Sequence, residues 1–241
     1  MNRLTKWLLA FLLLPAFAGA QEKVTVNDKN AQVRNIGSSF TEISVSGSID
    51  LYLSPDDKEV VVVSAKEEQY RDKIVTRVVG NKLEIFFNNK NFSIRSDMRL
   101  KAYVSFKQLN RITASGSSDV YVNGIVKSDK LEIHISGSSD FSGAVDVNEL
   151  RLDQSGSSDT KLSGRAGLVD VDLSGASDMK AFDLNSDVCK AHASGSSDIS
   201  VTVMKELYVN ASGASDVHYK GTGTVREVKT SGSSSVKMVR D

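Results

Sequence analysis

Apolar residues recur at fixed positions on either side of a five-residue motif, Ser-Gly-Ser/Ala-Ser-Asp or a close variant. The motif begins seven times, at Ser115, Ser136, Ser155, Ser174, Ser194, Ser212 and Ser231. Positions three and five residues before each start, and five and seven residues after it, are mostly apolar, and polar residues separate them. Alternation with a period of two is typical of strands that bury one face. Each repeat therefore predicts a strand, a tight bend at the glycine, a second strand and a second turn.

The spacing of the motif predicts a solenoid. Successive starts are 18 to 21 residues apart, and a period near 20 residues indicates one coil stacked per repeat. The strict 18-residue coil that is usual for left-handed β-helices fits this spacing poorly, and parallel crossovers are right-handed in the great majority of cases. The pattern thus predicts an all-β fold, a right-handed parallel β-helix of about seven coils over residues 109–241.

An outward column of charges supports parallel stacking in register. Four residues before the motif stand, coil by coil, Arg111, Glu132, Arg151, Asp170, Lys190, Tyr208 and Glu227. The sign alternates through the first five, so that stacking in register sets each charge beside its opposite. Two residues before the motif, His134 and His192 each meet an aspartate of a neighbouring coil, Asp153 and Asp172. We expect surface His–Asp pairs there rather than a metal site.

Residues 21–108 are less regular and predict a β layer that is continuous with the solenoid and caps its first coil. Ser46-Gly47-Ser48-Ile49-Asp50 is an eighth, degenerate copy of the motif. The strand-like runs that follow it are Val60 to Val63, Ile74 to Val79, Leu83 to Phe87 and Leu100 to Phe106. Gly80-Asn81 and Pro55-Asp56-Asp57 have the composition of hairpin turns.

The first 20 residues, 1–20, predict a secretory signal peptide. Arg3 and Lys6 precede an apolar run from Trp7 to Phe17, and Ala18-Gly19-Ala20 has the small residues of a cleavage site. The run is too short to span a bilayer as a helix. We expect an exported mature chain without a transmembrane segment, located in the periplasm or on the outer cell surface.

The charge balance excludes some classes of binding partner, and the cysteine content limits what can hold the fold together. The chain has 30 basic and 30 acidic residues, and loss of Arg3 and Lys6 with the leader would leave a net charge of −2. Such a balance argues against nucleic acid and against charge-driven binding to anionic membranes. The single cysteine, Cys189, excludes an internal disulfide, so packing and backbone hydrogen bonds must hold the fold. It falls at an inward position and is expected to pack as a small hydrophobe.

The motif contains nucleophile and acid residue types, but its repetition indicates a structural role. A catalytic site occurs once, and no histidine lies in the motif to act as the base that a serine nucleophile needs. Glycine supplies the positive φ or the close approach that a sharp bend requires. The expected bend glycines are Gly116, Gly137, Gly156, Gly175, Gly195, Gly213 and Gly232. We expect no catalytic residue, and the pattern names no ligand-binding residue.

The fifth motif position forms a column of carboxylates. Its members are Asp119, Asp140, Asp159, Asp178, Asp198 and Asp216. Neighbours stacked ~4.8 Å apart would repel by about 1 kcal/mol in water. Either backbone N–H groups and serine hydroxyls of the same bend bind each carboxylate, or a cation such as Ca²⁺ lies between the coils. Calcium-binding nonapeptide repeats have more Gly and Asp per coil, so we expect local donors, no metal and no cofactor.

As an ordered set, these motifs resemble the GIN-domain family, named putative auto-transporter adhesins and found in exported proteins of Bacteroidota. The resemblance rests on residues 46–53, on the tandem bends, and on Tyr219-Lys220-Gly221 followed by Ser231-Gly232-Ser233. It covers nearly all of the mature chain. The family pattern often has glycine at the fourth motif position, where this chain has serine. The resemblance implies an exported β-helical protein with no established activity and no site residues to transfer.

Two classes of function are compatible with this pattern. The favoured one is a non-enzymatic cell-envelope or surface protein, an adhesin or scaffold whose flat ladder of side chains binds an extracellular glycan or protein. The alternative is a polysaccharide lyase or hydrolase, because right-handed β-helices also host such enzymes. Their sites need clustered carboxylates in a cleft. Here the coils are short, lack long insertions to wall a cleft and carry few exposed aromatic residues, so we expect no enzyme.

Overall fold

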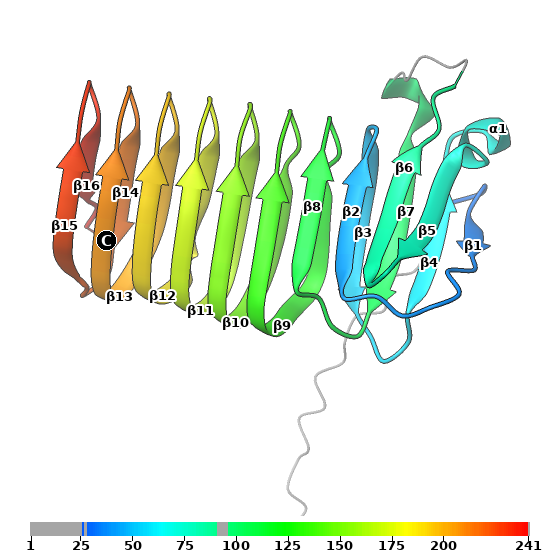
Figure 1. The fold of residues 1–241 in the computed structure, drawn as a ribbon, viewed down its shortest axis with the longest axis horizontal. Helices are drawn as coiled ribbons and strands as arrows, with labels where there is room; N and C mark the ends of the chain where they lie inside the picture. Colours follow the sequence, from blue (N-terminus) through cyan, green and yellow to red (C-terminus); the bar gives the residue numbers. More distant parts are fainter. Residues whose placement is uncertain (1–25, 27, 91–95, 241) are drawn as a thin grey trace, which may run out of the picture.

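The chain winds into a β-solenoid (Figure 1). This computed structural model describes residues 26, 28–90 and 96–240, and the predicted signal peptide lies outside them. The motif coils are built by β8 (Arg111–Ser115), β9 (Val120–Ile135), β10 (Phe141–Gln154), β11 (Asp159–Leu173), β12 (Asp178–Ala193), β13 (Asp198–Ala211), β14 (Asp216–Lys220), β15 (Thr224–Thr230) and β16 (Ser235–Met238). In Figure 1 the chain climbs in front, bends, descends behind and advances to the left, which is the predicted right-handed winding.

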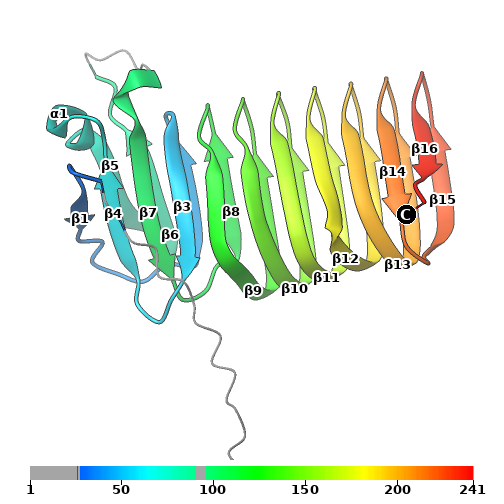
Figure 2. The ribbon, with the colours of Figure 1, turned by 180° about the vertical axis from the view of Figure 1, so that it is seen from behind.

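Each coil thus contributes one strand to each of two faces. We call the face built by strands before the bends the climbing face (Figure 1) and the face built by strands after them the descending face (Figure 2). Corresponding strands pair in parallel: Phe141 lies opposite Val120 in one neighbouring coil and Thr160 in the other. The predicted charge column is in register, because Glu132 lies opposite both Arg111 and Arg151.

The degenerate motif forms a coil of its own. β2 (Glu42–Ser46) pairs in parallel with β8, and β3 (Ile49–Pro55) pairs in parallel with β9. On its other side this coil carries β6 (Lys82–Phe87) and β7 (Leu100–Phe106), which are also parallel to it. The chain therefore forms the second coil of the stack first, with β2 and β3. It then adds the coil of β6 and β7 on one side of it, and finally builds the motif coils on the other side.

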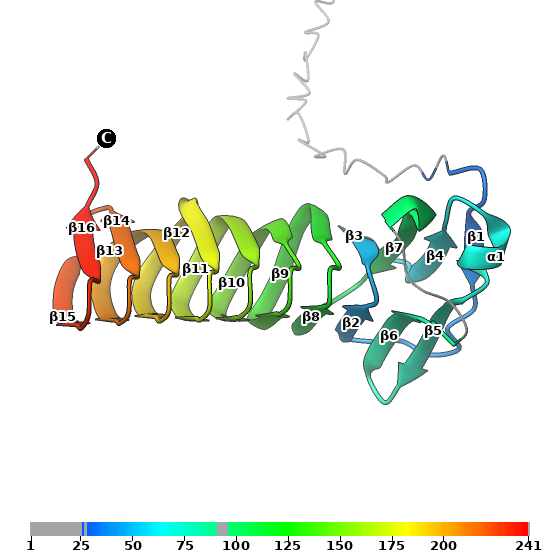
Figure 3. The ribbon, with the colours of Figure 1, turned by 90° about the horizontal axis from the view of Figure 1, so that it is seen from above.

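Antiparallel strands close the N-terminal end of the stack. β5 (Ile74–Val79) pairs with β6 beside the climbing face, while β4 (Val60–Ser64) pairs with β7 and β1 (Gln32–Arg34) with β4 beside the descending face. Figure 3 shows these two groups on opposite sides. Short helical segments, α1 (Glu68–Arg71) and η1 (Ser96–Met98), precede β5 and β7. All four predicted strand runs are present.

One of the two predicted hairpins is wrong. Gly80-Asn81 connects β5 to β6, which pair as antiparallel neighbours, so that prediction is confirmed. Pro55-Asp56-Asp57 connects β3 to β4, but β7 lies between these strands and pairs with both. The turn residues end β3 but do not make β3 and β4 a hairpin, because β7, a strand from much later in the chain, lies between them.

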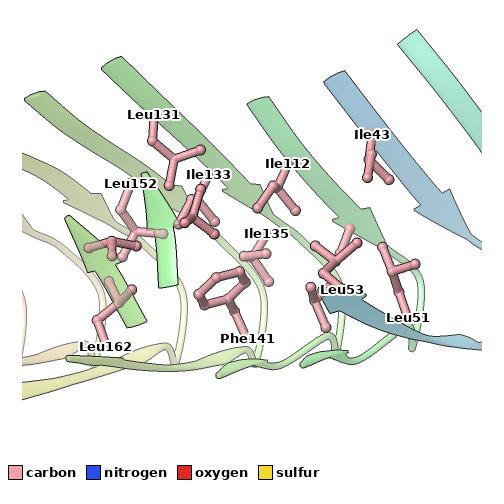
Figure 4. Close-up of a cluster of buried hydrophobic side chains, with 14 of the residues drawn as sticks. Ile43, Leu51, Leu53, Ile112, Leu131, Ile133, Ile135, Phe141, Leu152 and Leu162 are labelled. Atoms are coloured by element: carbon pink, nitrogen blue, oxygen red, sulfur yellow. The ribbon is translucent and has the colours of Figure 1, made fainter. Parts of the chain in front are cut away.

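Inward side chains from both faces form one core along the solenoid (Figure 4). Ile133 and Leu152 come from the climbing face and meet Phe141 and Leu162 from the descending face. Predicted inward positions before the bends are fully buried in the middle coils, where Ile133, Leu152 and Val171 are 0% exposed. Burial declines in the last coil, where Val228 is 46% and Met238 57% exposed. The last coil has no described coil beyond it to cover these side chains.

Candidate functional site

The bends form a row along one edge of the solenoid, at the top of Figure 1. The seven motif glycines have φ between 74° and 90°, a region that favours glycine. Stacking adds a second requirement. A Cβ on Gly175 would lie 2.5 Å from the carbonyl oxygen of Gly156, which already accepts the N–H of Ala176 at 2.8 Å. The glycines therefore let successive bends approach closely enough to hydrogen-bond.

The fourth motif serines lie beneath the bends. The buried members are Ser118, Ser139, Ser158, Ser177, Ser197 and Ser215, each 0% exposed. The hydroxyl of Ser177 donates to the carbonyl of Ser174 at 3.0 Å, and the N–H of Ser118 donates to Oγ of Ser139 at 3.0 Å. These hydroxyls bind the backbone of their own bend or of the adjacent bend, so their geometry serves packing rather than attack on a substrate.

The aspartates of the fifth position, which we call the acid column, line the descending face next to the bends. The N–H of Asp140 donates to Oδ1 of Asp119 at 3.1 Å, and the N–H of Asp159 donates to Oδ1 of Asp140 at 2.9 Å. Asp216 donates in the same way to Asp198 at 3.1 Å. We expected donors from the same bend. In these three pairs the amide donors instead come from the next coil, because parallel register places the amide beside the preceding carboxylate. The N–H groups of Asp178 and Asp198 donate to the carbonyls of Ser158 and Ser177.

A second outward column runs beside the acid column, two residues further along each strand. In stacking order it contains Tyr103, Tyr52, Tyr121, Ser142, Lys161, Lys180, Ser200, His218 and Lys237. Lys180 Nζ lies 3.5 Å from Asp159, and Lys237 Nζ lies 3.9 Å from Asp216. The stacked carboxylates thus have cations beside them along the C-terminal part of the stack.

Asp216 shows how the end of the acid column is stabilised. The hydroxyl of Ser235 donates to its Oδ1 at 2.6 Å. This bond, helped by the charges of Lys237 and His218, lowers the pKa of Asp216. Across the part of the chain that the structure describes, no group of three or more His, Cys, Asp or Glu is arranged to hold a metal ion. The carboxylates of Asp119, Asp140, Asp198 and Asp216 each accept a hydrogen bond from the next coil.

The N-terminal part of the second column is aromatic, and we call Tyr103, Tyr52 and Tyr121 the tyrosine ladder. The ring centroids of Tyr52 and Tyr103 are 5.0 Å apart with planes inclined by 17°. Those of Tyr52 and Tyr121 are 5.3 Å apart with planes inclined by 20°. The hydroxyl of Tyr103 donates to Asp28 at 2.8 Å, and that of Tyr121 donates to Asp119 at 3.2 Å. Both phenols are therefore held in fixed orientations.

Burial and nearby carboxylates raise the pKa values of the ladder phenols. Partial burial, together with the charge of Asp119 and the hydrogen bond to it, raises the pKa of Tyr121 to about 12. Burial is the main cause that raises the pKa of Tyr103, and the hydrogen bond to Asp28 is the second. Asp50 lies opposite Lys101 and directly follows Ile49 in the degenerate motif. Its burial and the nearby Asp119 raise the pKa of Asp50, although Lys101 opposes the shift.

Sequence patterns did not indicate the ladder before the fold was known. Tyr52 and Tyr121 both stand six residues after the first serine of a motif, so alignment of the degenerate copy with the first regular one contained the signal for that pair. Tyr103 follows no motif. It joins the ladder only because β7 pairs with β3, a contact between strands that are far apart in sequence.

The climbing face carries the predicted His–Asp pair. Nδ1 of His134 lies 3.0 Å from Asp153, which Arg151 also approaches, with Nε at 3.1 Å. The pair borders a shallow depression of about 360 Å³ that Thr113 and Asp172 also line. No hydroxyl among the described residues forms a hydrogen bond with His134, so a serine–histidine–aspartate arrangement is not assembled. His192 lies opposite Asp172, as expected.

Cys189 is completely buried, and this burial raises the pKa of its thiol to about 12, in keeping with a packing role. Within the described ranges, the helical segments are all too short to cross a bilayer.

Solved structures from species of Bacteroides and Parabacteroides share this fold. A putative adhesin from Bacteroides fragilis has 20% identity and a TM-score of 0.78, over 87% of this chain and 96% of that one. A putative lipid binding protein from Parabacteroides distasonis has 23% identity and a TM-score of 0.69 over the same shares. A putative adhesin from Parabacteroides merdae has 19% identity and a TM-score of 0.69, over 87% of this chain and 95% of that one.

At these identities the solved structures establish the fold alone. No curated protein matches the chain. The family model described as "Putative auto-transporter adhesin, head GIN domain" matches residues 39–223. This match runs from the coil of the degenerate motif through the sixth of the seven regular bends. It confirms the resemblance that the motifs indicated, and the chain therefore belongs to the family of head GIN domains.

Proposed function

We propose that this protein is a non-enzymatic, exported protein of the cell envelope or cell surface that acts as an adhesin or binding scaffold for an extracellular glycan or protein. The observation that carries the proposal is the pair of flat outer faces (Figures 1 and 2). Outward side chains recur on them at ~4.8 Å intervals from coil to coil. Such a surface suits an extended ligand, which can contact several coils at once. The adhesin name of the family points in the same direction.

The chemistry of the bends supports a non-enzymatic role. The motif serines at the fourth position are buried, and the one close His–Asp pair, His134 with Asp153, has no nucleophile bonded to it among the described residues. The depression beside Glu132 and the one beside His134 are both open to solvent and lined mainly by polar residues. The polysaccharide lyase or hydrolase that we considered as the alternative would need a walled site around its carboxylates.

Two measurements test the proposal. Protease treatment of intact cells should digest the protein if it is exposed on the surface and spare it if it is periplasmic. The purified exported chain should bind immobilised glycans or extracellular matrix proteins without degrading them. Binding to neither class would contradict the scaffold function. Sustained turnover of polysaccharide that a single side-chain substitution abolishes would establish the enzymatic alternative instead.

A further inference from the structure

We propose that the free face of Tyr121, at the open end of the tyrosine ladder, binds one neutral pyranose residue of a glycan. This inference rests on the binding function proposed above and gives it a location. Tyr52 has a ring on each side, whereas Tyr121 has one on a single side. At the other end of the ladder, β4 covers the coil edge, with Val62 opposite Tyr103. Only Tyr121 ends the ladder toward an uncovered position.

The side chain opposite Tyr121 in the next coil is too small to cover the ring. That position is Ser142, and Tyr121 remains 40% exposed. Coils are ~4.8 Å apart, and a sugar in van der Waals contact with the ring would lie about 4 Å from it. The sugar would therefore occupy the level of the next coil, above the short side chain of Ser142, where a further ladder ring would otherwise stand.

No described cation stacks on the free face of Tyr121. Lys161 follows Ser142 in the column and is two coils from Tyr121. The cation–ring contacts among the described residues involve Arg77 with Phe86 and Lys220 with Phe182, not Tyr121. The hydrogen bond from Tyr121 to Asp119 fixes the ring before a ligand arrives. A rigid tyrosine offers a large contact area at a low cost in conformational entropy.

Polar groups at the same level suit the hydroxyls of a sugar. Oδ1 of the exposed Asp140 accepts the N–H of Asp159, while its second oxygen and the hydroxyl of Ser142 have no hydrogen-bond partner among the described residues. A pyranose combines an apolar C–H face, which would stack on Tyr121, with a rim of hydroxyls that these groups can bind. The two adjacent carboxylates, Asp119 and Asp140, would repel a uronate and outnumber the one cation beside this level, Lys161. The site therefore selects neutral sugars.

The experiment uses the exported chain on an array of neutral, N-acetylated and uronate-containing oligosaccharides, followed by calorimetry on the glycans that bind. Ser142→Tyr adds a ring to the ladder and covers the free face of Tyr121. Ser200→Tyr is the matched control, because Ser200 lies in the same column three coils further along. Tyr121→Ala removes the stacking surface, and Tyr121→Phe keeps it.

We expect wild type, Ser200→Tyr and Tyr121→Phe to bind neutral glycans. Tyr121→Ala should weaken binding by about tenfold, and Ser142→Tyr should abolish it. Thermal melting shows whether each variant is folded, and the comparison of Tyr121→Phe with Tyr121→Ala decides the question if Ser142→Tyr does not fold. Equal binding by folded Ser142→Tyr and wild type would overturn the assignment, as would binding of uronates alone. If matrix proteins bind and no glycan does, this inference fails while the scaffold function stands.

Discussion

At the scale of the residue, a motif glycine meets two separate demands. Gly175 has φ of 85°, and a Cβ there would press on the carbonyl oxygen of Gly156. Gly80, in the β5–β6 hairpin, has φ of 65° with nothing within 4 Å of the Cβ position. The two positions thus share the backbone conformation and differ in stacking.

The pair gives a direct stability prediction. Gly80→Ala should lower the free energy of unfolding by about 1 kcal/mol, since it adds only the strain of a left-handed alanine. Gly175→Ala should cost ~2–4 kcal/mol, because it also forces two bends apart and lengthens their hydrogen bond. Urea unfolding of both variants measures the difference. Equal costs would mean that the stacked bends move apart freely.

Asp50 yields a prediction on pH. Its pKa in the folded protein is raised by burial and by Asp119. The charged form is therefore disfavoured by folding, and the penalty develops as pH rises from the unfolded pKa of about 3.9 through the higher folded value. Asp50→Asn should raise the melting temperature at neutral pH, and the gain should disappear in acid below the unfolded pKa.

Asp140→Asn, at a regular position of the acid column, is the control for this measurement because it also removes one carboxylate charge. A gain from Asp50→Asn that persists unchanged in acid would assign the effect to something other than ionisation. A loss of stability at neutral pH would indicate that the attraction of Lys101 for Asp50 outweighs its burial.

At the scale of the element, a strand in this solenoid is specified by which face it buries. Inward positions of the motif coils follow from the period of two alone, and Leu152 and Val171 are buried as expected. The period also identifies β2 and β3 as a coil. It does not specify which strands pair at the N-terminal end, because the insertion of β7 between β3 and β4 depends on contacts between distant segments.

The same limit explains which parts of the candidate site were predictable. The acid column was evident from spacing, whereas its donors were assigned to the wrong coil because sequence distance favours a local bend over a neighbouring strand. Tyr103 could not be placed beside Tyr52, since no repeat marks β7. Side chains within the periodic array were therefore predictable in position, and partners contributed from outside it were not.

Truncation of an inward leucine tests the burial of a single strand. Leu152→Ala should reduce the free energy of unfolding by ~2–5 kcal/mol, the range for cavities in well-packed cores. Val228, on β15 and 46% exposed, supplies the comparison: Val228→Ala should cost less than about 0.5 kcal/mol. A cost below that level for Leu152→Ala would contradict its place in the core, and chemical denaturation provides the measurement.

At the scale of the whole molecule, the order in which the stack is completed differs from the order of the sequence. The β2–β3 coil is flanked on one side by β6 and β7 and on the other by β8 and β9, all of which follow it in the chain. Beyond β9, each coil contacts mainly its immediate neighbours. The N-terminal end is thus closed by contacts between strands that are far apart in sequence, whereas the rest of the stack is built from contacts between successive coils.

This arrangement predicts where folding begins. Ile43→Ala, in the β2–β3 coil, should slow refolding, because the surrounding strands must assemble on that coil before the repeats can extend from it. Val225→Ala, in β15, should mainly speed unfolding from the C-terminal end of the described stack. Stopped-flow refolding and unfolding rates distinguish the two effects. If Val225→Ala slowed refolding and Ile43→Ala mainly sped unfolding, the folding nucleus would lie among the C-terminal repeats instead.

Because the coils stack in register, the number of coils can change during evolution. A tandem duplication that copies one motif with its two strands adds a coil whose glycine, buried serine and aspartate match those already present above and below it. The core would then continue through the added coil. In the charge column four residues before the motif, however, a copied Glu132 would lie beside its own duplicate, so copying two neighbouring coils together is what keeps the signs alternating. The length of the solenoid can therefore change by duplication of whole coils, while the N-terminal coils and the tyrosine ladder stay as they are.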